Sequence, residues 1–460
     1  MSQNRLVAVS NRLADPDKPA AGGLAVALEA ALKERDGIWI GASGSVVPDL
    51  AGSPPVHRTK TDHGEYVALD FDSADYEAYY AGYANGVLWP AFHHRFDLVR
   101  YDSSLENAYR RINTQFAQAV FAELRPGDDL WIHDYHLIPL ASALRALGCE
   151  NRIGFFLHTP LPPVATLTAI PRHEWLMRSF LSYDLIGFQS QEDLKNFQEY
   201  VTVQLHGTVA GDTVRAFGST SIARAFPIGI DVDAFRALAY SASAQRIYED
   251  ICLEYSRRKL LIGVDRLDYS KGLPQRIKAF RECLQAYPDT RRSATLIQVA
   301  SPSRENVEAY GEIQRELEGL CGAINGDFGE LDWMPVRYLH RTLGQEQLAG
   351  LYRAAKVALV TPLRDGMNLV AKEFLAAQDP DDPGVLVLSR FAGAAEQLGS
   401  AVLVNPHDIE ATAAAIRRAL WMPREERVAR HASLMQVLRE RDLAWWADAF
   451  LSQLQAMQRR

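Results

Sequence analysis

The residues of this chain best suited to chemistry lie between a short apolar run and a helical pattern. Residues 357–360 predict a buried parallel strand, and the apolar positions from Ala371 onward predict a helix. Asp365 and Gly366 lie between them, where an aspartate can cap the helix and a glycine can turn the chain. Such loops bind ligands in open α/β sheets, because the N–H groups that open the next helix attract phosphate.

Two carboxylates flank this loop. Asp365 and Glu373 are roughly two helical turns apart and can line one side of a pocket. We interpret the stretch as a cradle for a sugar nucleotide. Taken alone, an ordinary strand–helix junction with a capping aspartate explains it better, so the interpretation depends on the rest of the chain.

A second predicted strand end carries two cations. Residues 259–266 predict a strand that ends in Arg266, and residues 268–274 open a helix just after Lys271. Two cations around a helix N-terminus repel each other unless an anion sits between them. A bound diphosphate therefore explains Arg266 and Lys271 better than a basic pair on the surface does.

The first half of the chain repeats this pattern of polar residues at strand ends. A strand over 6–10 leads to Arg12, which is either a solvated surface cation or a ligand residue. The strand that begins at 129 ends near Asp134, and the strand that begins at 152 ends at His158. We favour a site role for His158 over a satisfied core histidine, because it repeats the same placement.

Histidines beside Asp134 raise the question of a metal site. His133 and His136 are metal-ligand types, but no third ligand follows at a matching spacing. Hydrogen bonding of a polyol by Asp134 is the better interpretation. Asp70 and Asp72 suggest a phosphatase or metal motif, but the residues that follow favour helix capping.

Glycines and aromatic residues complete the candidate set. Gly22 and Gly23 follow the first strand and let the backbone approach a ligand closely. They form no dinucleotide-binding fingerprint, which argues against an NAD site. Tyr80 and Trp89 usually would pack in a core, but each can also stack on a sugar and hydrogen-bond it.

Composition narrows the class of protein. The chain has 460 residues, enough for two domains, with 48% hydrophobic and 23% charged residues. A net charge of −8 argues against nucleic acid or an anionic membrane as the main partner. No apolar run is long enough for a membrane span, and no signal-peptide pattern occurs. Four scattered cysteines form no metal or redox motif, which predicts a reduced, cytoplasmic protein.

Predicted strands and helices alternate along the chain and place these residues. A polar, helical stretch over 231–255 connects two β/α halves, which predicts two α/β domains facing each other across a cleft. The remaining predicted strands cover 38–41, 66–71, 184–188, 224–230, 294–300, 336–339, 385–388 and 402–404.

Six motifs resemble the α,α-trehalose-6-phosphate synthase family of the UDP-forming type, and the resemblance extends from Leu6 to about Phe450. The motifs are Ser10-Asn11-Arg12, Gly22-Gly23-Leu24, Val87-Leu88-Trp89-Pro90-Ala91-Phe92-His93, Trp131-Ile132-His133-Asp134-Tyr135-His136-Leu137, Arg266-Leu267-Asp268-Tyr269-Ser270-Lys271-Gly272 and Thr361-Pro362-Leu363-Arg364-Asp365-Gly366-Met367-Asn368-Leu369-Val370.

The resemblance implies an α/β GT-B fold of two Rossmann-like domains with the active site in a cleft between them. It implies an N-terminal acceptor domain over 1–235, a nucleotide-sugar domain over 236–440, and a C-terminal helix over 441–460 that returns to the first domain. The implied reaction is a retaining transfer of glucose from a nucleoside diphosphate glucose, UDP-glucose first, to glucose 6-phosphate. It needs neither metal nor cofactor, and a leaving-group phosphate oxygen would accept the proton of the acceptor.

The resemblance also implies roles for individual residues. His158 would contact the donor glucose near the reacting carbon, Glu373 the ribose, and Arg12 and Arg304 the acceptor phosphate. The implied catalytic residues are His158, Asp134, Arg266, Lys271 and Asp365. The implied donor-binding residues are Gly22, Gly23, Arg266, Lys271, Asp365, Gly366, Met367, Asn368, Leu369, Val370 and Glu373. The implied acceptor-binding residues are Arg12, Tyr80, Trp89, Asp134 and Arg304.

Two alternatives stay open at this point. One is a related transferase with another phosphorylated acceptor, and the other is a non-catalytic sugar-phosphate sensor. Ala42 and Thr159 replace the residues that the family commonly has near the cleft, at positions that bear on acceptor fit. The sequence does not choose among uridine, guanosine and adenosine donors, and a homo-oligomer is compatible with it.

Overall fold

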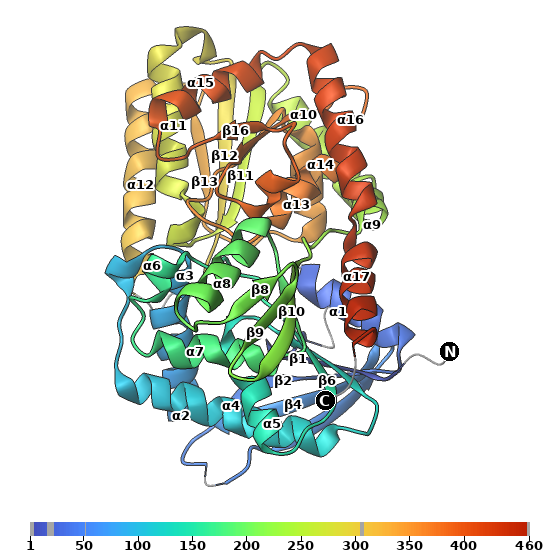
Figure 1. Ribbon diagram of the computed structural model, residues 1–460. Helices are drawn as coiled ribbons and strands as arrows, with labels where there is room; N and C mark the ends of the chain where they lie inside the picture. Colours follow the sequence, from blue (N-terminus) through green and yellow to red (C-terminus); the bar gives the residue numbers. More distant parts are fainter. Residues whose placement is uncertain (1–3, 16–22, 51, 304–307, 458–460) are drawn as a thin grey trace. The chain divides into compact units, whose positions relative to one another are not determined.

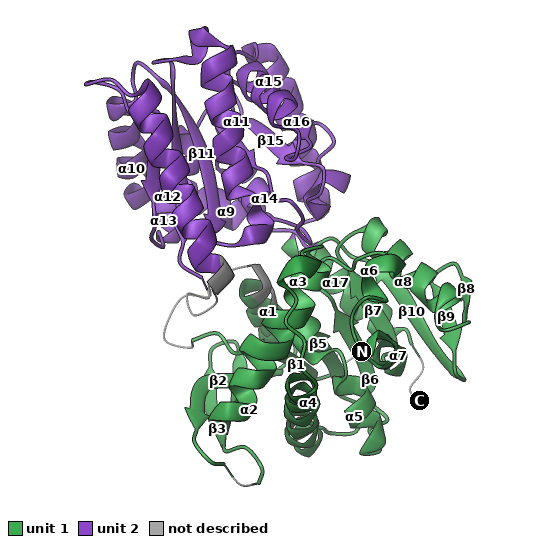
Figure 2. Cartoon of the chain, turned by 90° about the vertical axis from the view of Figure 1, so that its left-hand side faces the viewer, with its two compact units in different colours: residues 1–227, 443–460 green, residues 228–442 purple. Residues whose placement is uncertain are grey.

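The computed structural model describes residues 4–15, 23–50, 52–303 and 308–457. The chain forms two compact units: unit 1 comprises residues 1–227 and 443–460, and unit 2 comprises residues 228–442 (Figure 2). It therefore passes between the units after Pro227 and after Asp442. The family resemblance predicts these boundaries after residues 235 and 440.

Unit 1 is built on a ten-stranded sheet of order β3-β4-β2-β1-β5-β6-β7-β10-β9-β8 (Figure 1). Neighbouring strands from β4 to β10 run parallel, and antiparallel pairing occurs only towards the edges, at β3 and at β9 and β8. The strands are β1 (Leu6–Arg12), β2 (Ile38–Val47), β3 (Val56–Thr61), β4 (Gly64–Asp72), β5 (Asp129–His133), β6 (Arg152–Phe156), β7 (Leu185–Phe188), β8 (Thr208–Ala210), β9 (Thr213–Ala216) and β10 (Ser219–Ala225).

Helices cover this sheet. The α-helices are α1 (Gly23–Glu34), α2 (Ser73–Glu77), α3 (Trp89–Phe92), α4 (Ser103–Glu123), α5 (Leu140–Ala146), α6 (Val164–Leu167), α7 (His173–Ser179), α8 (Gln191–Val203) and α17 (Leu443–Gln455), with a π-helix η1 (Ala78–Leu88) and the 3₁₀ turns η2 (Phe96–Leu98), η3 (Tyr135–Leu137) and η4 (Phe180–Ser182). Helix α4 contacts α2, α5 and η1, while α1 contacts α17. Asp72 caps α2 by accepting from the N–H of Ala74 and of Asp75, which confirms the predicted capping role.

The last helix, α17, packs directly on the sheet of unit 1. The ring of Phe450 stacks on Trp131 of β5 with centroids 4.9 Å apart. It also covers two glycines: a Cβ on Gly154 would lie 2.7 Å from Phe450 Cε1, and one on Gly187 would lie 2.9 Å from Phe450 Cε2. The glycines of β6 and β7 therefore admit the helix at a distance that larger side chains would prevent.

Unit 2 has a six-stranded, fully parallel sheet of order β13-β12-β11-β14-β15-β16, the order of doubly wound nucleotide-binding sheets. Its central strands are nearly continuous buried apolar runs, as sheets covered on both faces require. The strands are β11 (Lys259–Arg266), β12 (Ala294–Ser301), β13 (Val336–Leu339), β14 (Val357–Val360), β15 (Val385–Ser389) and β16 (Val402–Val404).

Two groups of helices cover the sheet of unit 2. Helix α11 contacts α12 and α15, whereas α13 contacts α9, α10 and α14. The α-helices are α9 (Val232–Ala239), α10 (Ala242–Glu254), α11 (Leu273–Ala286), α12 (Glu308–Phe328), α13 (Gln345–Ala354), α14 (Leu369–Ala377), α15 (Ile409–Leu420) and α16 (Arg424–Glu440), and the 3₁₀ turns are η5 (Tyr269–Lys271), η6 (Pro288–Thr290) and η7 (Gly393–Glu396). The predicted α/β class, with two Rossmann-like units, is confirmed.

Both sheets reverse their strand order at one point. In unit 1 the chain proceeds outward from β1 on one side and from β5 on the other. In unit 2 the corresponding pair is β11 and β14. Ligands of open α/β sheets bind beyond the carboxyl ends of the strands at such reversals.

Two predicted elements are wrong in detail. The strand expected over 224–230 is β10 and ends at Ala225, because Pro227 has no N–H to give to a sheet ladder. The helical stretch over 231–255 is two helices, α9 and α10, since Ser241 interrupts it and caps α10 through the N–H of Ala244.

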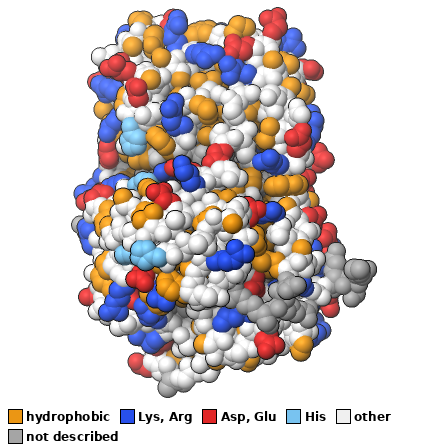
Figure 3. Space-filling view, viewed as in Figure 1, with side chains coloured by type: hydrophobic (Ala, Val, Ile, Leu, Met, Phe, Trp, Pro, Cys, Tyr) orange, Lys and Arg blue, Asp and Glu red, His pale blue; other side chains and the backbone are white. Residues whose placement is uncertain are grey.

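Charged side chains of both signs are interspersed on the face shown in Figure 3, without a continuous basic stripe. This agrees with the negative net charge of the chain. Among the helices that the structure describes, none has the length and apolar character needed to cross a bilayer.

We expect Gly154→Ala to destabilise unit 1, because the new methyl group would collide with the Phe450 ring. Overpacking of this kind costs about 1–3 kcal/mol. The measurement is the thermal unfolding midpoint, which should fall by roughly 2–4 °C per kcal/mol. The control is Gly322→Ala in α12, where a Cβ meets nothing within 4 Å. An unchanged midpoint for Gly154→Ala would contradict the packing of α17 described here.

Candidate active site

The predicted site residues lie at the carboxyl ends of strands in both units. Arg12 ends β1, Asp134 follows β5, and His158 lies just beyond β6 in unit 1. In unit 2, Arg266 ends β11 and Asp365 follows β14. Gly22 and Arg304 lie outside the described residues, and Gly23 is the first residue of α1.

Lys271 of unit 2 is positioned by a tightly bonded turn. The buried carboxylate of Asp268 accepts hydrogen bonds from the N–H and hydroxyl of Ser270, at 2.9 and 2.8 Å, and from the hydroxyl of Tyr310 at 3.0 Å. Gly272 then adopts a left-handed conformation with φ of 64°, and a Cβ there would overlap the carbonyl of Thr361. The turn therefore presses the backbone next to Lys271 against the end of β14.

The anion closest to Lys271 comes from the protein. Its Nζ lies 2.6 Å from Asp365 Oδ2, and the two side chains are 12% and 13% exposed. Arg266 is exposed, with Nη1 3.5 Å from the hydroxyl of Ser303. Mutual repulsion of the two cations is thus partly relieved by Asp365. An anionic ligand at this edge would meet Arg266 at the surface and the Lys271–Asp365 pair beneath it.

The loop between β14 and α14 is held on both sides. The N–H of Leu363 donates to Ser270 at 2.7 Å, and the N–H of Asp365 donates to Phe391 at 3.1 Å. Met367 accepts from the N–H of Ala394 at 2.9 Å. A Cβ on Gly393 would overlap the carbonyl of Gly366, which shows how closely the two turns approach. The loop is consequently preorganised before any ligand binds.

The cap of α14 is Asn368, and the predicted capping role of Asp365 is wrong. Asn368 Oδ1 accepts from the N–H of Ala371 at 3.3 Å, while its Nδ2 donates to Asp365 Oδ2 at 3.0 Å. Asn368 also has a positive φ of 80°, which is uncommon for a residue other than glycine. The N–H groups of Leu369 and Val370 follow in the first turn, where intrahelical acceptors are lacking.

Two ionisable neighbours on α14 have strongly shifted pKa values. Burial raises the pKa of Glu373 to about 7. Burial also lowers the pKa of Lys372 to about 7, and its Nζ donates to the carbonyl of Ile228 at 2.6 Å and to Gln397 Oε1 at 2.8 Å. Strong desolvation of a carboxyl group next to a ligand-binding loop is typical of functional sites.

Asp134 of unit 1 combines backbone strain with cross-strand bonds. Its φ is 74°, a conformation that a residue other than glycine keeps only when its surroundings enforce it. Its N–H donates to Phe156 at 2.8 Å, and its Oδ1 accepts from the N–H of His158 at 3.2 Å. Asp134, which the sequence predicts to hydrogen-bond a polyol, thereby joins the ends of β5 and β6.

His158 is held as a neutral imidazole. Its Nε2 lies 3.1 Å from Nδ1 of His133, and its Nδ1 lies 3.3 Å from the amide nitrogen of Gln189. Burial lowers the pKa of His158 to about 3, and burial together with His158 lowers the pKa of His133 well below its ordinary value. His158 therefore carries no charge near neutral pH, and both of its ring nitrogens have partners within unit 1.

Arg12 and Tyr80 share a neighbour in Tyr76. Burial raises the pKa of Tyr76 to about 12, and the charge of Arg12 opposes part of that rise. Tyr80 stacks on Tyr76 and on His136, with ring centroids 5.9 and 5.7 Å apart. The guanidinium of Arg12 lies over Gly44, where a side chain would displace it.

The backbone around these residues is irregular. The pairing register of β1 with β2 shifts between Val9 and Arg12, and Tyr80 belongs to the π-helix η1. Both features re-aim side chains and are common at functional sites. Trp89 is only 7% exposed and packs on His93, with centroids 4.1 Å apart, so little of its ring reaches the surface.

The residues discussed for a metal site do not converge. His133 faces His158, whereas His136 stacks on Tyr80 and Tyr135. Within the described ranges, no cluster of three or more histidine, cysteine, aspartate and glutamate side chains is arranged to hold a metal ion.

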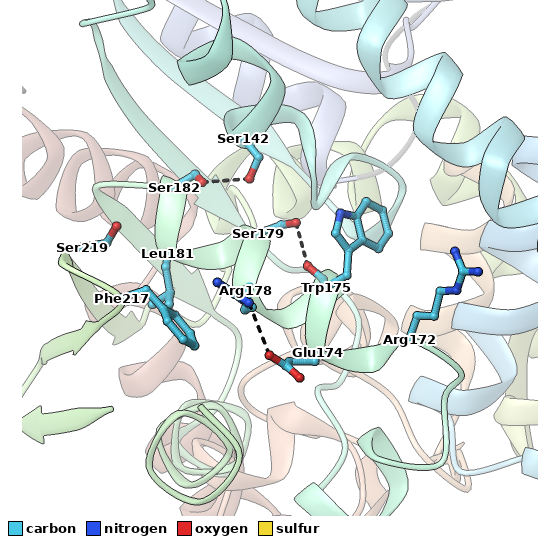
Figure 4. A pocket seen from close by; sticks show the side chains of 10 residues that line it. All are labelled: Ser142, Arg172, Glu174, Trp175, Arg178, Ser179, Leu181, Ser182, Phe217 and Ser219. Atoms are coloured by element: carbon cyan, nitrogen blue, oxygen red, sulfur yellow. Dashed lines mark hydrogen bonds and ion pairs between the residues drawn. The ribbon is translucent and has the colours of Figure 1, made fainter. Parts of the chain in front are cut away.

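A cavity of about 590 Å³ in unit 1 lies elsewhere (Figure 4). Ser182 precedes β7 and Ser219 begins β10, so these lining residues belong to the amino-terminal edge of the sheet. Polar side chains that line the cavity bond to each other: Ser142 to Ser182 at 2.8 Å, and Arg178 to Glu174 at 3.4 Å. This cavity is separate from the strand ends that carry the predicted site.

Sequence reasoning missed Gln189 and Arg276, and it gave no supporting role to His133, which it considered only as a metal ligand, or to Asp268, which it named only within a motif. For Arg276 a signal existed. It falls on the apolar face of a helix whose other positions on that face include Leu273, Ile277 and Phe280, where an arginine must have buried partners.

Comparison with known proteins gives a consistent result. The model of glycosyltransferase family 20 matches residues 5–456. A trehalose-6-phosphate synthase of Sinorhizobium fredii is 47% identical over 458 residues, covering 98% of each chain.

Solved structures agree in fold. An α,α-trehalose-phosphate synthase (UDP-forming) from Burkholderia xenovorans in complex with glucose-6-phosphate has a TM-score of 0.94 and 46% identity, covering 98% of this chain and 100% of its own. A protein described as trehalose-6-phosphate from E. coli, bound with UDP-2-fluoro glucose, has a TM-score of 0.94 and 39% identity, covering 99% and 100%.

We expect Asn368→Ala to cost about 2 kcal/mol of stability in unit 2, because it removes a helix cap and leaves a Cβ at positive φ. Asn368→Gly should cost only about a few tenths of a kcal/mol, since glycine tolerates this backbone. Asp408→Ala, which removes the cap of α15 at an ordinary φ of −94°, should fall between them. Thermal unfolding of the three variants measures the order of their stability losses. Equal losses for the two Asn368 variants would contradict a strained backbone at this position.

Proposed function

The chain belongs to glycosyltransferase family 20, and on that basis we propose that it transfers glucose from UDP-glucose to glucose 6-phosphate, giving α,α-trehalose 6-phosphate. One observation carries the proposal. The strand ends of unit 2 present cations and helix N–H groups suited to a nucleoside diphosphate, in a chain similar to proteins solved with glucose-6-phosphate and with UDP-2-fluoro glucose.

Donor binding is assigned to unit 2. Arg266 and Lys271 hold the diphosphate, and the backbone from Asp365 to Val370 holds the glucose and the distal phosphate. Glu373 accepts hydrogen bonds from the ribose hydroxyls. The preorganised loop and the exposed Arg266 support these roles, since fixed donors stabilise a developing charge without reorganising. Gly22 and Gly23 of unit 1 are also assigned to donor binding, and Gly23 closes over the donor in the same proposal.

Acceptor binding is assigned to Arg12, Tyr80, Trp89 and Asp134 of unit 1 and to Arg304 of unit 2. Arg12 and Arg304 hold the phosphate of glucose 6-phosphate, while Tyr80 and Asp134 bond its hydroxyls. Support comes from the shared neighbourhood of Arg12 and Tyr80 around Tyr76 and from the strained backbone of Asp134. Trp89 contributes at most its exposed edge.

The proposed reaction proceeds on one face of the donor sugar. The acceptor hydroxyl forms a bond to the anomeric carbon as the bond from that carbon to the phosphate oxygen breaks. UDP leaves with the electron pair, and one of its phosphate oxygens takes the hydroxyl proton. Arg266, Lys271 and the N–H groups of α14 stabilise the charge that grows on UDP.

In this scheme His158 is a neutral group that contacts the donor glucose near the reacting carbon. Because burial lowers its pKa, the proposal gives it no role as a charged acid near neutral pH. Asp134 and Asp365 are assigned as ligands and not as a nucleophile–acid pair, since Asp365 is already bonded to Lys271.

Neither a metal nor another cofactor takes part in the proposed reaction, and the nucleotide sugar is a substrate. We place the enzyme in the cytoplasm, where sugar phosphates and nucleotide sugars are made and where its four free cysteines would stay reduced. The proposal is compatible with a homo-oligomer.

The test is steady-state turnover of glucose 6-phosphate with UDP-, GDP- and ADP-glucose, with and without EDTA, and with the sugar product identified by NMR. We expect trehalose 6-phosphate in the presence of EDTA, with UDP-glucose as the best donor. Transfer to a different phosphorylated acceptor would favour the related transferase. Ligand binding without release of any nucleoside diphosphate would favour the sensor.

Donor affinity should rise with pH, because the carboxylate form of Glu373 is the better acceptor for ribose hydroxyls. Its raised pKa of about 7 means that the ionised fraction grows through neutrality. We expect the Kd of UDP-glucose, measured by calorimetry without acceptor, to fall by about tenfold between pH 6 and 8. Glu373→Gln removes the titration and should give a flat profile. A pH-independent Kd for the unmodified enzyme would remove Glu373 from the ribose site.

A further inference from the structure

Arg276 is a buried arginine of helix α11 that has no role in the assignments above. Its side chain is 0% exposed, and it lies on the same face of the helix as Leu273 and Ile277. Burying a guanidinium is unfavourable unless its N–H groups are paired. The groups that pair with it therefore reveal what it holds in place.

Three neighbouring strands supply those partners. Arg276 Nη1 donates to Asp265 Oδ2 at 2.5 Å and to Gln298 Oε1 at 3.0 Å, and its Nε donates to Thr361 Oγ1 at 3.0 Å. Asp265 belongs to β11, Gln298 to β12, and Thr361 directly follows β14. One planar group thus joins β12, β11 and β14, the strands around the reversal of order in the sheet.

The chain continues from Asp265 and from Thr361 directly into the proposed diphosphate site. Asp265 immediately precedes Arg266, and Thr361 opens the loop that carries Asp365. Arg276 Nη2 also points to the carbonyl of Lys271, at 3.5 Å. The guanidinium therefore lies under the backbone of both cations and of the loop that follows β14.

The contribution of Arg276 is geometric more than electrostatic. Its charge is compensated at close range by Asp265, whose side chain is only 3% exposed. A guanidinium donates in several fixed directions at once, whereas a lysine at the same place is a single point charge. Only the arginine can bond Asp265, Gln298 and Thr361 together.

We propose that Arg276 is a positioning residue for the donor diphosphate: it sets the spacing of Arg266, Lys271 and the loop over 361–368, and acts on the donor through them. The inference rests on the proposed function, because it takes UDP-glucose as the ligand of this site. It adds a buried residue of helix α11 to the residues assigned to the donor diphosphate.

The test uses Arg276→Lys, which keeps the charge next to Asp265 and loses the planar donors, and Thr361→Val, which removes one acceptor at nearly constant volume. We expect Arg276→Lys to raise the Kd of UDP and the KM for UDP-glucose by about tenfold, and Thr361→Val by about threefold, since small misplacements of binding groups are costly. The Kd of glucose 6-phosphate should not change.

Two controls separate positioning from general destabilisation. Arg281→Lys makes the same substitution on the same helix, at a partly exposed residue paired with Asp327, and should leave UDP affinity unchanged. In a Lys271→Ala background, Arg276→Lys should weaken UDP binding by less than it does in the unmodified chain, because Arg276 acts partly through Lys271.

The outcomes are distinct. Failure of the unmodified protein to bind UDP would overturn the proposed function. Normal UDP affinity in folded Arg276→Lys, or fully additive effects with Lys271→Ala, would overturn the inference alone. If Arg276→Lys does not fold, Thr361→Val decides by the same criterion.

Discussion

A single buried guanidinium sets the geometry of unit 2. Arg276 is buried, and Asp265, Gln298 and Thr361 accept its hydrogen bonds, which offsets the cost of burying a guanidinium. Those acceptors come from three strands, so the interior cation fixes the strand ends relative to each other. Burial raises the pKa of Asp265, and the paired arginine opposes that rise. The pair of Arg276 and Asp265 therefore constrains the positions of the strand ends where a diphosphate is proposed to bind.

In each unit a predicted site residue has a strained backbone conformation. Asp134 and Asn368 each adopt a positive φ directly after a strand or loop, and each uses its carbonyl-type side-chain oxygen to bond a nearby N–H group. Strain of this kind persists only where the surroundings enforce it. It leaves the side chain with one orientation and the local backbone with few alternatives. Preorganisation then comes from the protein and not from the ligand.

The electrostatics of the two units differ. Unit 1 holds a neutral histidine pair, His133 and His158, whose pKa values burial keeps low. Unit 2 presents the exposed Arg266 above the ion pair of Lys271 and Asp365. A hydrogen-bonding surface suits a sugar that changes little in charge, whereas cations suit a leaving group that becomes more negative. These features match the proposed places of His158 beside the donor glucose and of Arg266 and Lys271 at the diphosphate.

Local sequence patterns predict many of the elements and the polar residues at their ends. The strands predicted over 259–266, 336–339, 357–360 and 402–404 coincide with β11, β13, β14 and β16, because hydrophobicity and its periodicity are local properties. The motif resemblance likewise identified the family. Which groups meet depends on the packing of the whole chain. Lys271 and Asp365 are 94 residues apart, and Arg276 and Thr361 are 85 apart. Their contact depends on β11 lying beside β14, and strand order follows from packing of the whole sheet, which no local pattern encodes.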